Sequence, residues 1–138
     1  MKILVIDAKG GGIGRQIVSA IKEKLPESTL TAVGTNSAAT SAMLNAGADN
    51  AATGENAVVV GCRWADVIIG PIGIVIADSL HGEITPSMAV AVGQSAAKRI
   101  LIPINHCENI VVGVSELSVG RLIEEALKEL ALIGLSEL

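Results

Sequence analysis

Apolar runs and amphipathic stretches alternate along the 138 residues of the chain. Residues 2–6 form a nearly continuous apolar run, which predicts a strand buried on both faces of a sheet. From residue 13 to residue 25 an apolar side chain recurs at every fourth position, which predicts an amphipathic helix that Pro26 ends. Residues 29–33 predict a second strand, and a polar turn after it leads into a helix that Gly47 terminates.

The alternation continues in the second half of the chain, with one ambiguous stretch. Residues 57–64 contain a valine triplet typical of strands, but a helix is favoured because residues 66–69 then give the next strand. Proline at a first helical position predicts a short buried helix over residues 71–80 and another over residues 86–96. The remaining pattern predicts strands at residues 99–104 and 110–114 and a closing amphipathic helix at residues 119–130.

This alternation of strands and helices predicts the fold class. We expect an α/β protein, a Rossmann-like three-layer sandwich with a mostly parallel sheet of five to six strands. The length fits a single domain spanning residues 1–138. In such sheets, ligands bind at the carboxyl ends of the strands, near the point where the strand order reverses. The loops that leave the strands are therefore the candidate site.

The first of these loops is rich in glycine and opens a helix. Its candidate cofactor-binding residues are Gly10, Gly11, Gly12, Ile13 and Gly14. Glycines let a backbone pass close to a ligand, and a helix N-terminus offers free N–H groups to a phosphate. The spacing differs from the dinucleotide motif G-x-G-x-x-G, and the loop lacks the Lys and Ser/Thr of a P-loop. The alternative is a tight turn that packs the helix on the strand and binds nothing.

The second strand is followed by the polar residues Thr35, Asn36 and Ser37. An NAD site usually has a carboxylate near this position for the ribose hydroxyls. Here hydroxyl and amide groups stand instead, and they would tolerate an additional 2′-phosphate. The predicted cofactor is therefore NADP(H) or another nucleotide, although Asn36 or Ser37 is equally well interpreted as a simple helix cap.

Two later strand exits have the same character. Gly70, Pro71 and Gly73 would let a ligand approach the backbone, and Asn105, His106 and Cys107 follow the strand after that. Weak catalytic candidates are Asp7, His106 and Cys107, with ordinary loop residues as the alternative. No metal is indicated, because the acidic and histidine side chains near His81 lack a recognised ligand spacing.

Composition narrows the chemistry further. The chain is 50% hydrophobic, with a mean hydropathy of +0.57, one Trp and no Tyr or Phe. A tyrosine general acid and base-stacking aromatic platforms are thereby excluded. A net charge of -4 with scattered bases argues against nucleic acid as a partner, and the longest apolar run is too short for a membrane span. A charged fraction of only 17% favours a homo-oligomer, and the absence of a signal-peptide pattern predicts a cytoplasmic location.

Two resemblances follow from these motifs. Gly12-Ile13-Gly14 resembles the end of the short-chain dehydrogenase motif T-G-x-x-x-G-I-G, but Asp7 and Ala8 stand where that family has Thr and Gly. The catalytic Tyr of that family has no counterpart here. Over most of the chain, the sequence is similar to an uncharacterised bacterial domain-of-unknown-function family of small proteins. The strings that carry this resemblance are VIDAKGGGIG, GTNSAATSAMLNAGAD, ATGENA, ADVIIGPIGIVIADS and GEITPSMA.

The sequence thus predicts a protein that binds a phosphate-bearing nucleotide or an NADP-like dinucleotide. A small oxidoreductase is one activity that this site would allow, with the proton supplied by Asp7, His106, Cys107 or solvent. The alternative is a non-catalytic ligand-sensing or regulatory subunit that acts through oligomer assembly. The resemblance to an uncharacterised family implies a single cytoplasmic domain and adds no catalytic residue to either reading.

Overall fold

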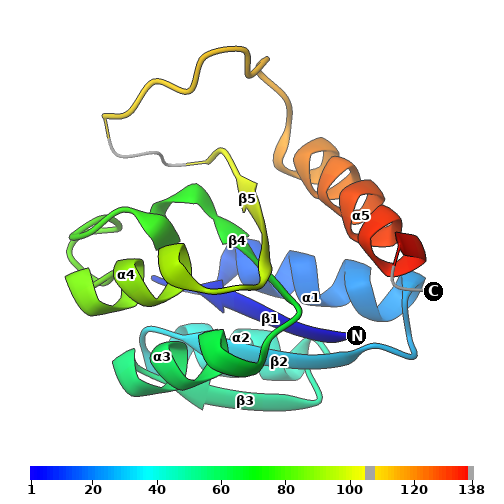
Figure 1. Ribbon diagram of the computed structural model, residues 1–138, viewed down its shortest axis with the longest axis horizontal. Helices are drawn as coiled ribbons and strands as arrows, with labels where there is room; N and C mark the ends of the chain where they lie inside the picture. The colour runs from blue at the N-terminus through cyan, green and yellow to red at the C-terminus, as the bar shows by residue number, and fades with distance from the viewer. Residues whose placement is uncertain (105–107, 137–138) are drawn as a thin grey trace.

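A five-stranded parallel sheet forms the centre of the computed structural model, which describes residues 1–104 and 108–136 (Figure 1). The strands lie in the order β3-β2-β1-β4-β5. They are β1 (Lys2–Asp7), β2 (Thr29–Gly34), β3 (Asn50–Thr53), β4 (Val67–Pro71) and β5 (Lys98–Ile102). All neighbouring pairs are parallel, and the predicted Rossmann-like fold is confirmed.

Helices cover both faces of this sheet. They are α1 (Gly12–Lys24), α2 (Ser37–Asn45), α3 (Glu55–Trp64), α4 (Pro86–Gln94) and α5 (Val119–Ser136), with the 3-10 turn η1 (Ile72–Val75) after β4. One core joins Ile3 and Val5 to α1, α2 and α5, and the other joins Leu4 and Ile6 to α3 and α4. Alternate side chains of β1 therefore enter opposite layers, as the pleat of a strand requires.

Local sequence explains where the helices begin. The Asn36 side chain accepts a hydrogen bond from the Ala39 N–H at 2.9 Å, and the Thr85 hydroxyl accepts one from the Met88 N–H at 3.1 Å. Pro86 occupies the first turn of α4, where its missing N–H has no cost. The predicted helix starts are confirmed here, and so is the helical interpretation of residues 57–64.

Two predictions of secondary structure are wrong, and one strand was missed. The stretch 110–114 is not a strand: it belongs to an irregular arm in which Ile110 is 90% exposed and Val112 is 92% exposed. The helix predicted for residues 71–80 is one 3-10 turn followed by other turns, because Asp78 and Leu80 adopt positive φ angles of 63° and 54°. The edge strand β3 escaped prediction because only two alanines give it apolar character.

The strand order reverses between β1 and β4. From β1 the chain crosses to β2 on one side, whereas β4 pairs with β1 on the other. The carboxyl ends of these two strands therefore open into a crevice with no crossover connection above it. Within the described ranges, none of the helices combines the length and the apolar character required to cross a bilayer.

Gly14 allows α1 to pack closely on β1. A Cβ atom built on Gly14 would lie 2.5 Å from the Met43 Sδ and 2.8 Å from the Asp7 Cβ. Gly12, two residues earlier, faces open space within 4 Å. Gly14 is therefore required for packing, whereas the position of Gly12 has room for a side chain.

We predict that Gly14→Ala lowers the free energy of unfolding by about 1–3 kcal/mol, because the added methyl group overpacks the contact between α1 and β1. Gly12→Ala is the matched control and should leave stability unchanged or raise it by up to about 1 kcal/mol, because alanine favours helix. Urea denaturation followed by circular dichroism measures both variants. Equal losses in the two variants would contradict this assignment.

Candidate functional site

The glycine loop between β1 and α1 contains two kinds of glycine. Gly11 has a φ of 72°, and a Cβ on it would lie 2.9 Å from the Ala39 Cα of α2, so neither its conformation nor its space admits a side chain. Gly10 and Gly12 are exposed, and nothing lies within 4 Å of their Cβ positions. Packing therefore explains Gly11 and Gly14, whereas Gly10 and Gly12 leave an open backbone surface.

The first turn of α1 presents backbone donors to this surface. The Gly14 N–H donates to the Asp7 carboxylate at 2.7 Å, and the Arg15 N–H makes the first helical bond, to the Gly11 carbonyl at 2.8 Å. The N–H groups of Gly12 and Ile13 precede that bond and have no intrahelical acceptor. Two donors at the positive end of the helix dipole thus face the space above the loop.

A cavity of about 250 Å³ lies against these donors. Its lining residues are Asp7, Ala8, Lys9, Gly10, Gly12, Ile13, Gln16, Pro71 and Leu80. The cavity thus joins the exit of β1 to the exit of β4, at the point where the strand order reverses. Drug-sized ligand pockets span about 300–1,000 Å³, so this cavity matches a small or partly enclosed ligand.

Asp7 is the buried acid of the cavity wall. It is only 5% exposed, and burial raises the pKa of its carboxyl above the ordinary value of 3.8, although the bond from the Gly14 N–H opposes this effect. Among the other residues that line the cavity, Lys9 contributes a cation at the rim. The wall therefore offers a proton-holding group and a positive charge beside the backbone donors.

Thr35 and Asn36 have an internal partner, which sequence reasoning missed. The Thr35 hydroxyl and the Asn36 amide donate to the Glu83 carboxylate at 2.8 and 2.6 Å. The Lys9 N–H donates to the same carboxylate at 3.1 and 3.2 Å. Ser37 is exposed and starts α2. Glu83 leaves no motif in the sequence, but it stands in a loop that follows a strand, and that placement is the signal that could have found it.

The other residues that the sequence predicted for the site do not all line the cavity. Pro71 lines the cavity, whereas Gly70 packs against the Ile6 carbonyl, and a Cβ on Gly73 would lie 3.0 Å from the Ser79 Oγ. Gly70 and Gly73 thus serve packing. Asn105, His106 and Cys107 lie outside the described residues. Cys62 is buried, and burial raises the pKa of its thiol to about 11, so it stays protonated at neutral pH.

Among the described residues, no three His, Cys, Asp or Glu side chains lie close enough together to hold a metal ion. The prediction of a metal-free site stays a prediction.

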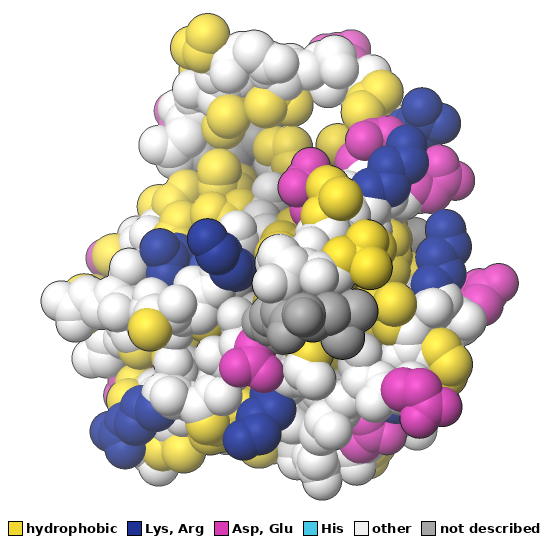
Figure 2. Space-filling view, turned by 45° about the vertical axis from the view of Figure 1, so that its right-hand side comes forward, with side chains coloured by type: hydrophobic (Ala, Val, Ile, Leu, Met, Phe, Trp, Pro, Cys, Tyr) yellow, Lys and Arg dark blue, Asp and Glu magenta, His cyan; other side chains and the backbone are white. Residues whose placement is uncertain are grey.

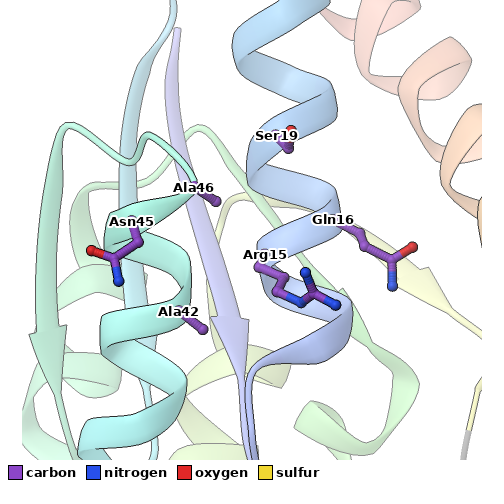
Figure 3. Close-up of a pocket in the computed structure, with 6 residues that line it drawn as sticks. All are labelled: Arg15, Gln16, Ser19, Ala42, Asn45 and Ala46. Carbon is purple, nitrogen blue, oxygen red and sulfur yellow. The ribbon is translucent and has the colours of Figure 1, made fainter.

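A second hollow lies between α1 and α2 on the outer face of the helices. It measures about 480 Å³ and is lined by Arg15, Gln16, Ser19, Ala42, Asn45 and Ala46 (Figure 3). Figure 3 shows the methyl groups of Ala42 and Ala46 on the side of α2 that faces α1. The small side chains of α2 create this groove, which contains none of the loop glycines. We therefore place the candidate site at the sheet edge rather than here.

We predict that Asp7→Asn changes the pH dependence of stability. Between 3.8 and the raised pKa, the unfolded chain has released the Asp7 proton and the folded chain still holds it, so rising pH lowers the free energy of unfolding. Asparagine removes this effect and can still accept the bond from the Gly14 N–H. Urea denaturation at about pH 4 and pH 7 should show the variant gaining stability relative to wild type as pH rises. A relative loss would contradict the prediction.

Comparisons with known proteins identify the family. No curated protein matches the chain. In solved structures, the chain is similar to a dodecameric FMN-dependent UbiX-like decarboxylase from Escherichia coli O157:H7, with 20% sequence identity, a TM-score of 0.47, and coverage of 97% of this chain and 76% of that chain. The family model described as domain of unknown function DUF3842 matches residues 2–133. The chain therefore belongs to the DUF3842 family.

Proposed function

We propose that the protein binds a phosphate-bearing nucleotide in the crevice between the ends of β1 and β4. The observation that carries this proposal is the cavity of about 250 Å³ that lies directly on the open backbone of the glycine loop. The phosphate would accept hydrogen bonds from the N–H groups of Gly12 and Ile13, with Lys9 as a neighbouring cation. The nucleoside would extend toward Pro71 and Leu80, which form the apolar end of the cavity.

The structure changes which nucleotide is favoured. The preference for NADP rested on Thr35, Asn36 and Ser37 as polar groups that would tolerate a 2′-phosphate, but Thr35 and Asn36 donate to the Glu83 carboxylate. A second phosphate at this position would meet a negative charge. We therefore propose a nucleotide with a single phosphorylated end in the cavity, and we leave hydride transfer out of the proposal.

We predict that nucleotides raise the melting temperature of the wild-type protein. A panel of ATP, GTP, FMN, coenzyme A, NADH and NADPH in thermal-shift assays, followed by calorimetric titration, identifies the ligand. Gly12→Asp should weaken binding of that ligand at least tenfold, because it places a carboxylate where the phosphate sits. The fold should survive, since an acidic residue suits the first turn of a helix.

The control for this variant is Gly120→Asp, which makes the same charge change in the first turn of α5 at an exposed position with open space. It should leave binding unchanged. Absence of any binding below about 1 mM, equivalent to about 4 kcal/mol, would overturn the proposed function. Trp64 is a poor reporter for this test, because it ends α3 next to the amino end of β4, on the opposite edge of the sheet.

A second candidate function is regulation through assembly, and the arm at residues 108–118 favours it. Ile110 and Val112 are almost fully exposed, and Val114 and Leu117 are 44% and 42% exposed. Figure 2 shows hydrophobic side chains on the underside of the arm and on the surface beneath it. A two-fold axis would place identical apolar arms against each other, so a second copy of the chain is the proposed partner.

We predict that the double substitution Ile110→Asp with Val112→Asp shifts the protein toward the monomer, because four like charges would meet in each pair of arms. Sedimentation velocity measures the oligomeric state with and without the nucleotide found above. Val90→Asp is the control, since Val90 is 52% exposed on α4. A wild-type protein that stays monomeric at all concentrations would exclude assembly through the arm.

A further inference from the structure

Glu83 joins three segments at the edge of the sheet. Its Oε1 accepts from the Asn36 amide at 2.6 Å and from the Thr35 hydroxyl at 2.8 Å. The Lys9 N–H reaches both carboxylate oxygens, at 3.2 and 3.1 Å, and the Asn36 amide also donates to the Lys9 carbonyl at 2.8 Å. One carboxylate thus ties the loop after β4 to the exits of β1 and β2.

The donors around Glu83 form an anion-binding set. Two side chains and one backbone N–H converge on a single negative charge, as they would on a phosphate or carboxylate ligand. Burial acts to raise the pKa of Glu83, but the hydrogen bonds from Asn36, Thr35 and the Lys9 N–H together hold it below the ordinary value of 4.5. Glu83 is therefore ionised at neutral pH, and the set is already occupied by an anion of the protein itself.

The turn that carries Glu83 is firmly built. The Glu83 N–H donates to the Leu80 carbonyl at 3.2 Å, and the Asp78 N–H donates to the Ile84 carbonyl at 2.8 Å. Ile84 is completely buried in the core, and Ser79 is 4% exposed. Leu80 and His81 hold left-handed φ angles of 54° and 58°, which side chains rarely adopt. The surrounding contacts thus fix the position of Glu83 at the end of β2.

Glu83 stands beside the cavity, because Lys9, whose N–H donates to its carboxylate, and Leu80, from the same turn, both belong to the cavity lining. The cavity reaches Pro71 and Leu80, and its lining includes no residue of the turn between β2 and α2. A nucleoside that extends from the glycine loop to Leu80 would come beside the turn that holds Glu83, and any group that it directs toward the end of β2 would meet the Glu83 carboxylate. Ribose hydroxyls can donate to a carboxylate oxygen, whereas a phosphate there would face a like charge.

We propose that Glu83 determines the ligand specificity of the site by excluding phosphate from the end of β2, so that the protein selects nucleotides whose ribose hydroxyls are unphosphorylated. This inference rests on the proposed nucleotide-binding function and names the ligand class of that same site.

The test compares two ligands that differ by one phosphate. Calorimetric titration measures the dissociation constants of 5′-AMP and of adenosine 2′,5′-bisphosphate with wild type and with Glu83→Gln. Wild type should bind 5′-AMP at least tenfold more tightly than the bisphosphate. Glu83→Gln removes the charge at nearly constant size and should reduce that ratio at least tenfold.

Glu55→Gln is the matched control, because the Glu55 carboxylate also accepts a threonine hydroxyl, that of Thr85 at 2.6 Å, but Thr85 does not line the cavity, whereas Lys9, which donates to Glu83, does. It should leave the ratio unchanged. Equal wild-type affinities for the two ligands would overturn the inference without any variant. An affinity ratio of 5′-AMP to the bisphosphate that is the same in Glu83→Gln as in wild type would overturn it as well. In both of these cases, binding of 5′-AMP to wild type would still support the proposed function. Failure of both ligands to bind wild type would overturn the function and the inference together.

Discussion

The contact of α1 with β1 at Gly14 is the constraint on which the candidate site depends. Because Gly14 has no side chain, its N–H reaches the Asp7 carboxylate at 2.7 Å, and the last residue of β1 holds the first turn of α1. This contact aims the free N–H groups of that turn into the crevice beside β4. It also buries Asp7, which raises the pKa of its carboxyl. The close packing of α1 on β1, the position of the free N–H groups and the raised pKa of Asp7 thus all follow from the missing side chain of Gly14.

The absence of Tyr and Phe shapes how such a site can recognise a ligand. The cavity is lined by glycine backbone, aliphatic side chains, the Gln16 amide, one buried acid and one cation at the rim. Glu83 adds a fixed negative charge at the end of β2, held by Thr35, Asn36 and the Lys9 N–H. The recognition that we propose therefore depends on the sign and position of charge: the site would attract a phosphate at the glycine loop and repel one at the end of β2.

The layers of the fold could be predicted from the sequence because periodicity reports burial. The run at residues 2–6 and the four-residue spacing of α1 each reflect contact with the sheet, and both predictions are confirmed. The apolar stretch 110–114 has the same pattern but lacks a partner strand among the described residues, and pattern alone does not reveal partners. The role of Glu83 could not be predicted for a related reason, because its hydrogen bonds join residues that lie 47 to 74 positions apart in the sequence. Local motifs found the glycine loop, but only the tertiary fold brings Glu83 to Thr35.

We propose that the ligand phosphate sits on the glycine loop, where the strand order reverses. Amide chemical-shift mapping during titration with 5′-AMP tests it most directly, since each residue reports separately. We expect the largest shifts on the N–H groups of Gly10, Gly12 and Ile13, with smaller shifts at Lys9. Shifts centred on the groove between α1 and α2, at Ser19 and Ala46, would contradict it.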